Sequence, residues 1–112
     1  MINTPNDLSY DDILIGQQDS FIIKITESMV EKFSNLSGDL NPLHMDNEFA
    51  ESSSFNKRIV HGMLLASLFW QLIGMKLPGT NALYFSQTLN FRPPCYIDDE
   101  IPVFGEVIEK SD

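Results

Sequence analysis

Residues 59–77 (IVHGMLLASLFWQLIGMKL) constrain the fold more than any other part of the chain. From about His61 to Met75 the segment has the length of a helix, but its large apolar side chains occupy the whole circumference rather than one stripe. Such a helix requires burial on most of its sides. The segment approaches membrane-spanning length, yet polar residues such as Gln71 and Lys76 interrupt it. We therefore expect a long helix buried in protein, with no membrane association.

Extended apolar segments on either side of this helix predict strands. Residues 19–25 alternate apolar and polar side chains, which is the period of a half-buried strand. The pair Pro78-Gly79 ends the long helix, and we expect further strands over residues 82–92 and 97–109. The pattern predicts an α+β fold in which one buried helix faces a strand-rich sheet.

Two shorter helices are expected between the first strand and the long helix. Thr26 is placed to cap a helix whose apolar stripe runs to Leu36, and Gly38 suits the end of that helix. Asp46 is placed to cap a short helix that runs through Ala50. The chain between these helices is therefore held at both ends.

Composition limits what the folded chain binds. The 112 residues are 43% hydrophobic, which suffices for the core of a single domain. A formal net charge of -9 disfavours binding to nucleic acid or to anionic lipid. The single cysteine excludes an intrachain disulfide, and the first residues lack the basic start and apolar core of a signal peptide. We expect a cytoplasmic location.

The loop of residues 39–44 (DLNPLH) holds a carboxylate and an imidazole close together. Pro42 fixes its own backbone and biases Asn41 toward an extended conformation, so the loop is constrained. The ordinary pKa is about 3.9 for Asp and about 6.5 for His, so Asp39 and His44 can exchange protons with one water molecule near neutral pH. This chemistry needs no metal. Taken singly, however, Asp39 also fits a solvated turn residue, and His44 an imidazole bonded to a backbone carbonyl.

The surrounding strings resemble one known family. SGDLNPLHMD at residues 37–46, followed by FA at residues 49–50 and by IVHGMLLA at residues 59–66, resembles the hydratase motif of the MaoC-like (R)-specific enoyl-CoA hydratases. The resemblance spans about residues 21–109. It implies a hot-dog fold, in which an antiparallel β-sheet wraps a long central helix. It also implies a homodimer that binds an acyl-CoA or acyl-carrier-protein thioester near the subunit interface, with no cofactor other than the coenzyme A of the substrate.

The resemblance assigns catalytic roles to Asp39, His44 and Gly62. Asp39 and His44 match the residues that hold and activate the water, which attacks the β-carbon of a trans-2-enoyl thioester to give the (R)-3-hydroxyacyl thioester. Gly62 matches the residue whose backbone N–H faces the thioester oxygen, and the start of a helix supplies such donors. A glycine here is also compatible with close packing of the helix alone.

Four other residues are expected to contact the substrate or to shape the pocket that binds it. Asn41 orients the loop or hydrogen-bonds near the site. Lys57 and Arg58 are the cations best placed to meet the phosphates of coenzyme A, although they also fit a solvated pair. Trp70 stands where similar hydratases tend to carry a small residue, so it shortens or redirects the acyl pocket. We expect His61 to bond the helix entry or to pack at an interface rather than to act as a second base.

Family domains normally continue for a few tens of residues with further strands of the same sheet. We therefore expect residues 1–112 to be a single MaoC-like domain that lacks its last strands. The chain is then a truncated piece, a protein completed by a partner chain, or a shortened relative. A hot-dog acyl-CoA thioesterase and a non-catalytic acyl-thioester-binding or assembly subunit remain the alternative functions. The string from Asp39 to His44 favours hydration.

The resemblance generates one prediction, which concerns Trp70. Its bulk should restrict the enzyme to short acyl chains, so Trp70→Ser should raise kcat/KM for longer enoyl-CoA substrates relative to crotonyl-CoA. The measurement is the profile of kcat/KM against acyl-chain length in the two proteins. Identical profiles would remove Trp70 from its assigned role.

Overall fold

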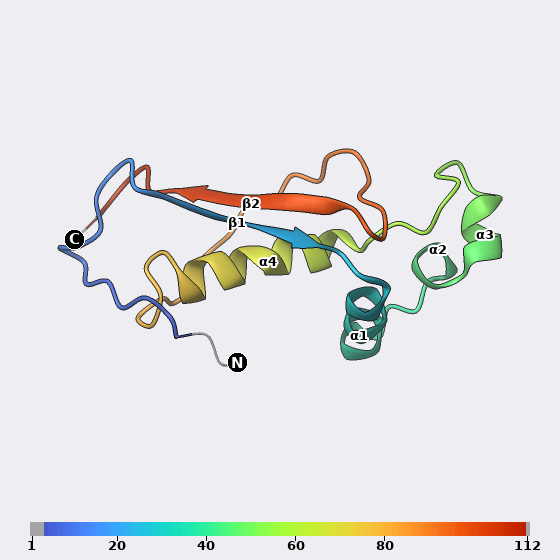
Figure 1. Cartoon of the computed structure of the whole chain (residues 1–112), viewed down its shortest axis with the longest axis horizontal. Helices are drawn as coiled ribbons and strands as arrows, with labels where there is room; N and C mark the ends of the chain where they lie inside the picture. Colours follow the sequence, from blue (N-terminus) through green and yellow to red (C-terminus); the bar gives the residue numbers. More distant parts are fainter. Residues whose placement is uncertain (1–3, 112) are drawn as a thin grey trace. The chain divides into compact units, whose positions relative to one another are not determined.

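A computed structural model describes residues 4–111 of the chain (Figure 1). In chain order, the elements are strand β1 (Gln18–Lys24), helices α1 (Glu27–Ser37), α2 (Pro42–Met45), α3 (Asn47–Glu51) and α4 (Gly62–Met75), and strand β2 (Glu100–Glu106). The described residues form two compact units. The first unit comprises residues 4–22, 66–89 and 102–111, and the second comprises residues 23–65 and 90–101.

Strands β1 and β2 pair in a two-stranded sheet and run in opposite directions (Figure 1). In the first unit the pairing continues past the strands, because Val107 N–H donates to Gln17 O at 2.9 Å and Gly16 N–H donates to Val107 O at 2.7 Å. Side chains along β1 alternate between exposed and partly buried. The half-buried strand predicted for residues 19–25 is confirmed.

The strand predicted for residues 82–92 is absent from the described part of the chain, and this prediction was wrong. The expected strand over residues 97–109 is shorter, spanning Glu100–Glu106. A strand needs a neighbour to complete its backbone hydrogen bonds, and within residues 4–111 no strand pairs with residues 82–92. The side chains of Leu83 and Phe85 are accordingly 92% and 100% exposed.

Helix α4 buries one face in the first unit. Leu68 and Leu72 are buried, and a Cβ atom on Gly105 of β2 would lie 2.5 Å from Leu72 Cδ2. The missing side chain at Gly105 therefore lets the helix approach the strand. Trp70 remains 54% exposed. The predicted burial on most sides is therefore confirmed for the face of α4 that carries Leu68 and Leu72, and it is wrong for the face that carries Trp70. No helix within residues 4–111 is long and apolar enough to cross a membrane.

In the second unit, the ends of α1 are fixed as the sequence predicts. Thr26 Oγ1 accepts a hydrogen bond from Met29 N–H at 3.2 Å, and Gly38 takes a left-handed conformation with φ of 81°. The expected apolar stripe is wrong at its end, because Leu36 is 85% exposed. The buried face instead runs through Val30 and Ser34, four positions apart, and each is 0% exposed.

The predicted loop around Pro42 contains one turn of helix, α2. Asn41 caps this turn, and its Oδ1 accepts a hydrogen bond from Leu43 N–H at 3.0 Å. Pro42 is favourable at the first helical position, because the N–H that it lacks would have no partner inside the helix. The next prediction is confirmed, since Asp46 Oδ1 accepts a hydrogen bond from Phe49 N–H at 3.2 Å and caps α3.

The cap of α1 provides a test of the fold. Thr26→Ala removes the acceptor for Met29 N–H and should lower the free energy of unfolding by about 1 kcal/mol. Thr26→Ser keeps the hydroxyl and should lose much less. Urea unfolding of the three proteins measures the difference, and equal losses in the two variants would contradict a role for the hydroxyl.

Candidate active site

A cavity of about 320 Å³ in the second unit brings the predicted acid–base pair together. Its lining comes from α1, from the turn before α2, from α2 and from the start of α4. The lining residues are Phe33, Ser37, Asp39, His44, His61, Gly62 and Met63. All three residues predicted to be catalytic, Asp39, His44 and Gly62, therefore line one cavity.

His44 has a defined basic nitrogen. Its Nδ1 lies 2.8 Å from the carbonyl oxygen of Ile59, which can only accept a hydrogen bond. Nδ1 must therefore carry the proton, and in the neutral ring Nε2 carries the lone pair. The side chain of His44 is 14% exposed, so the ring is largely shielded while Nε2 faces Asp39.

His44 Nε2 and Asp39 Oδ2 are 3.8 Å apart. This distance is too long for a direct hydrogen bond, and it suits two groups that share one water molecule. Asp39 Oδ1 accepts a hydrogen bond from Asn41 N–H at 3.1 Å, which fixes the carboxylate against its own loop. The side chain of Asp39 is 52% exposed, so the carboxylate is reachable from solvent.

Gly62 is the first residue of α4 and lines the cavity. The first N–H groups of a helix have no partner inside the helix, and they lie at the positive end of its dipole. A Cβ atom at Gly62 would lie 2.8 Å from two ring carbons of Phe91. Gly62 therefore satisfies a packing requirement at the start of α4, where the first N–H groups of the helix have no partner inside it.

Asn41 orients the loop, as one of its predicted roles requires, because its side chain caps α2. A contact between Asn41 and substrate stays a prediction. Trp70 lies in the first unit, where its ring stacks on Tyr84 with centroids 3.7 Å apart. Its effect on acyl-chain length also stays a prediction.

Arg58 is a correction to the sequence analysis. Its side chain is 6% exposed, its Nε donates to His44 O at 2.6 Å, and its Nη1 lies 2.8 Å from Glu27 Oε1. The guanidinium is therefore buried and already bonded to His44 O and Glu27, so it is not free to bind the phosphates of coenzyme A. Arg58 instead ties the backbone of His44 to helix α1.

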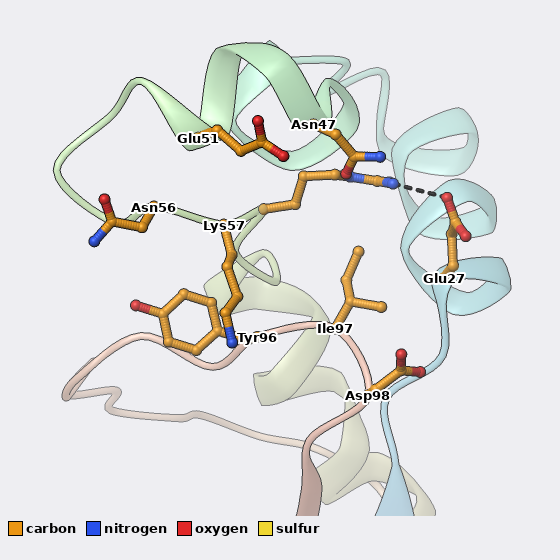
Figure 2. Close-up of a pocket in the computed structure, with 9 residues that line it drawn as sticks. Glu27, Asn47, Glu51, Asn56, Lys57, Tyr96, Ile97 and Asp98 are labelled. Carbon is orange, nitrogen blue, oxygen red and sulfur yellow. Dashed lines mark hydrogen bonds and ion pairs between the residues drawn. The ribbon is translucent and has the colours of Figure 1, made fainter.

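Lys57 lies at a second, polar pocket of about 280 Å³ (Figure 2). Figure 2 shows carboxylates from Glu27, Glu51 and Asp98 around this pocket and the Lys57 nitrogen beside the Tyr96 ring, 5.4 Å from the ring centre. A phosphate entering here would meet more carboxylates than free cations. The phosphate contact of Lys57 remains a prediction that this pocket does not favour.

His61 also lines the cavity, although the sequence does not predict a catalytic role for it. It is 3% exposed, and its ring stacks on the His44 ring with centroids 3.8 Å apart and planes inclined by 23°. Burial lowers the pKa of His61, so its ring is neutral near neutral pH. The one signal in the sequence was its place immediately before Gly62, where a side chain at the start of a helix can reach the preceding loop.

Asp39, His44 and His61 also form a group with possible metal ligands, whose ligand atoms lie within 4.8 Å of one another. Ligand nitrogens must point toward a common centre, but the two stacked rings lie in nearly parallel planes. His61 Nε2 is also 3.2 Å from the carbonyl oxygen of Asp39 and donates its proton there. The geometry therefore suits proton exchange better than metal binding.

Comparison with known proteins finds a matching family model and similar proteins with related names. Residues 15–112 match the family model described as MaoC like domain. The (R)-specific enoyl-CoA hydratase of Aeromonas caviae is 41% identical over 100 residues, covering 89% of this chain and 75% of that protein. The 3-hydroxybutyryl-CoA dehydratase of Methylorubrum extorquens is 40% identical over 102 residues, and the match covers 91% of this chain and 65% of that protein.

Solved structures agree with the sequence relatives. The (R)-hydratase from A. caviae involved in PHA biosynthesis is 40% identical, with a TM-score of 0.87 over 89% of this chain and 76% of that one. The R-hydratase PhaJ1 from Pseudomonas aeruginosa, in the unliganded form, is 37% identical, with a TM-score of 0.88 over 97% and 68%. The expected hot-dog fold is confirmed.

Arg58 provides a test of the site. Arg58→Met removes the bonds to His44 O and Glu27 and should lower the free energy of unfolding by about 2 kcal/mol. Lys57→Met is the matched control, because Lys57 is exposed and its loss should change stability by less than about 0.5 kcal/mol. Urea unfolding and KM for an enoyl-CoA separate the roles. An Arg58→Met protein with unchanged stability and a raised KM would instead support the predicted contact between Arg58 and the phosphates of coenzyme A.

Proposed function

Because this chain belongs to the MaoC-like domain family, we propose that it catalyses the reversible hydration of trans-2-enoyl-CoA to (R)-3-hydroxyacyl-CoA. One observation carries the proposal. The bond from His44 Nδ1 to Ile59 O leaves Nε2 as a base facing Asp39 across 3.8 Å, in a cavity that Gly62 also lines. The (R) configuration rests on the names of the relatives.

In the proposed reaction, one proton moves from water to His44 and then to the α-carbon of the substrate. His44 Nε2 accepts a proton from the water held between His44 and Asp39, while the water oxygen bonds to the β-carbon of the enoyl thioester. The electron pair of the double bond moves toward the thioester oxygen, where N–H groups at the start of α4 stabilise the negative charge. The imidazolium then returns its proton to the α-carbon, and the Asp39 carboxylate stabilises the charged ring in between.

The proposal includes the substrate carrier and the assembly. Coenzyme A is proposed as the carrier, because the A. caviae and M. extorquens relatives are named for CoA thioesters. We also propose a homodimer and no further cofactor, since the acid–base pair supplies both proton steps. No feature of the cavity favours the thioesterase or the non-catalytic subunit.

The test is incubation of the purified protein with crotonyl-CoA. Hydration should appear as loss of enoyl absorbance, with (R)-3-hydroxybutyryl-CoA as the product. Asp39→Asn keeps the Oδ1 acceptor for Asn41 N–H but loses the charge, and His44→Ala loses the base. Each should lower kcat by about 100- to 10,000-fold.

Asp11→Asn is the control, because Asp11 is exposed and lies in the first unit. It should leave kcat unchanged. Release of free coenzyme A without hydration would support the thioesterase instead. A folded protein that does neither would falsify the proposal.

A further inference from the structure

We infer that His61 is a positioning residue, which holds Asp39 and His44 in their working geometry by one hydrogen bond and one ring stack. The inference rests on the proposed hydration, since it assigns His61 a part in that reaction. His61 touches both members of the pair. Its Nε2 lies 3.2 Å from Asp39 O, and its ring centre lies 3.8 Å from that of His44.

The neighbours of His61 settle which nitrogen carries its proton. The carbonyl of Asp39 can only accept, so Nε2 of His61 must donate. Ser34 Oγ lies 3.0 Å from the same nitrogen and shares its single N–H with Asp39 O, because the Ser34 O–H donates to Met45 Sδ at 3.0 Å. One N–H of His61 thus serves two acceptors, Ser34 Oγ and Asp39 O, and both contacts require the Nε2–H tautomer. Helices α1 and α2 and the Asp39 loop are thereby joined through one imidazole.

The stack holds the His44 ring in its plane. His61 covers one face of that ring, while Nδ1 of His44 is held by Ile59 O at 2.8 Å. His61 also meets the Phe33 ring edge-on, with centroids 5.0 Å apart and planes inclined by 61°. His44 therefore cannot turn its Nε2 away from Asp39 without displacing a buried ring.

A neutral His61 suits this role. The charged or titratable groups that face it are His44 and Asp39, while Ser34, Met45 and Phe33 are uncharged. Burial lowers the pKa of His61, and the neighbouring His44 adds to this effect. A charged His61 would oppose the protonation of His44 that hydration requires, whereas a neutral ring does not.

The second nitrogen of His61 supports the same conclusion. Nδ1 is buried and has no hydrogen-bond partner among the described residues. A buried polar atom without a partner is unfavourable for stability and requires an explanation. An apolar ring would avoid this cost but would lose the Nε2 bond to Asp39 O, so the donor at Nε2 explains why an imidazole occupies the position.

Two substitutions separate the bond from the stack. His61→Phe keeps an aromatic face against His44 and loses the donor. His61→Gln places an amide N–H near the position of Nε2 and loses the ring. The readouts are kcat and KM for crotonyl-CoA, and the ¹⁵N NMR signals of His44 without substrate. The chain has 2 histidines, so each variant leaves the His44 signals alone in the spectrum.

For His61→Phe, kcat should fall by about 100-fold, because displacement of a catalytic group by about 1 Å has an effect of this size. KM should stay within about 2-fold, because uniform binding of substrate is unchanged. For His61→Gln, the donor is retained, so kcat should fall less, but the His44 signals should show a mixture of the Nδ1–H and Nε2–H tautomers. A purely structural role would not change this tautomer ratio in folded protein.

The inference is overturned if both folded variants keep the kcat of the parent protein and the Nδ1–H tautomer of His44. It is also overturned if both are as inactive as His44→Ala while the His44 signals are unchanged, since His61 would then transfer protons itself. If one variant does not fold, the other still decides. If the parent protein does not hydrate crotonyl-CoA, the proposed function fails, and the His44 signals still test the positioning.

Discussion

The site depends on the hydrogen bond from His44 Nδ1 to the carbonyl of Ile59. This bond places the lone pair of His44 on Nε2 and aims it at Asp39 across 3.8 Å. A neutral ring with the other tautomer would present an N–H to the carboxylate and could not accept a proton from the water. Ile59 lies just before α4, and Arg58 binds the carbonyl of His44. The segment that leads into the long helix therefore sets both the tautomer and the place of the base.

The sequence predicts best those features that depend on near neighbours in the chain. The caps at Thr26 and Asp46 follow from residues three positions apart, and the structure confirms them. The resemblance to the family motif also predicts that Asp39, His44 and Gly62 share one site, and all three line one cavity. The caps and the Asp39–His44 pair are each encoded within a short stretch of chain, whereas Gly62 joins the pair only through the family motif.

The features that the sequence did not predict depend on distant residues. Arg58 pairs with Glu27, 31 positions away, and this partner turns an apparent surface cation into a buried one. His61 meets Ser34, 27 positions away, which no local pattern indicates. The expected strand over residues 82–92 lacks a neighbouring strand within residues 4–111. A single sequence carries little information on such pairings.

Gly62 shows how one position can serve two requirements that mutation cannot easily separate. An added methyl group would collide with the Phe91 ring and would also change the space in front of the first N–H groups of α4. A loss of activity on simple replacement would therefore be ambiguous. A second substitution that reduces the ring at position 91 would separate the packing contribution from the electrostatic one. A side chain at position 62 therefore requires the exposed Phe91 ring to shift.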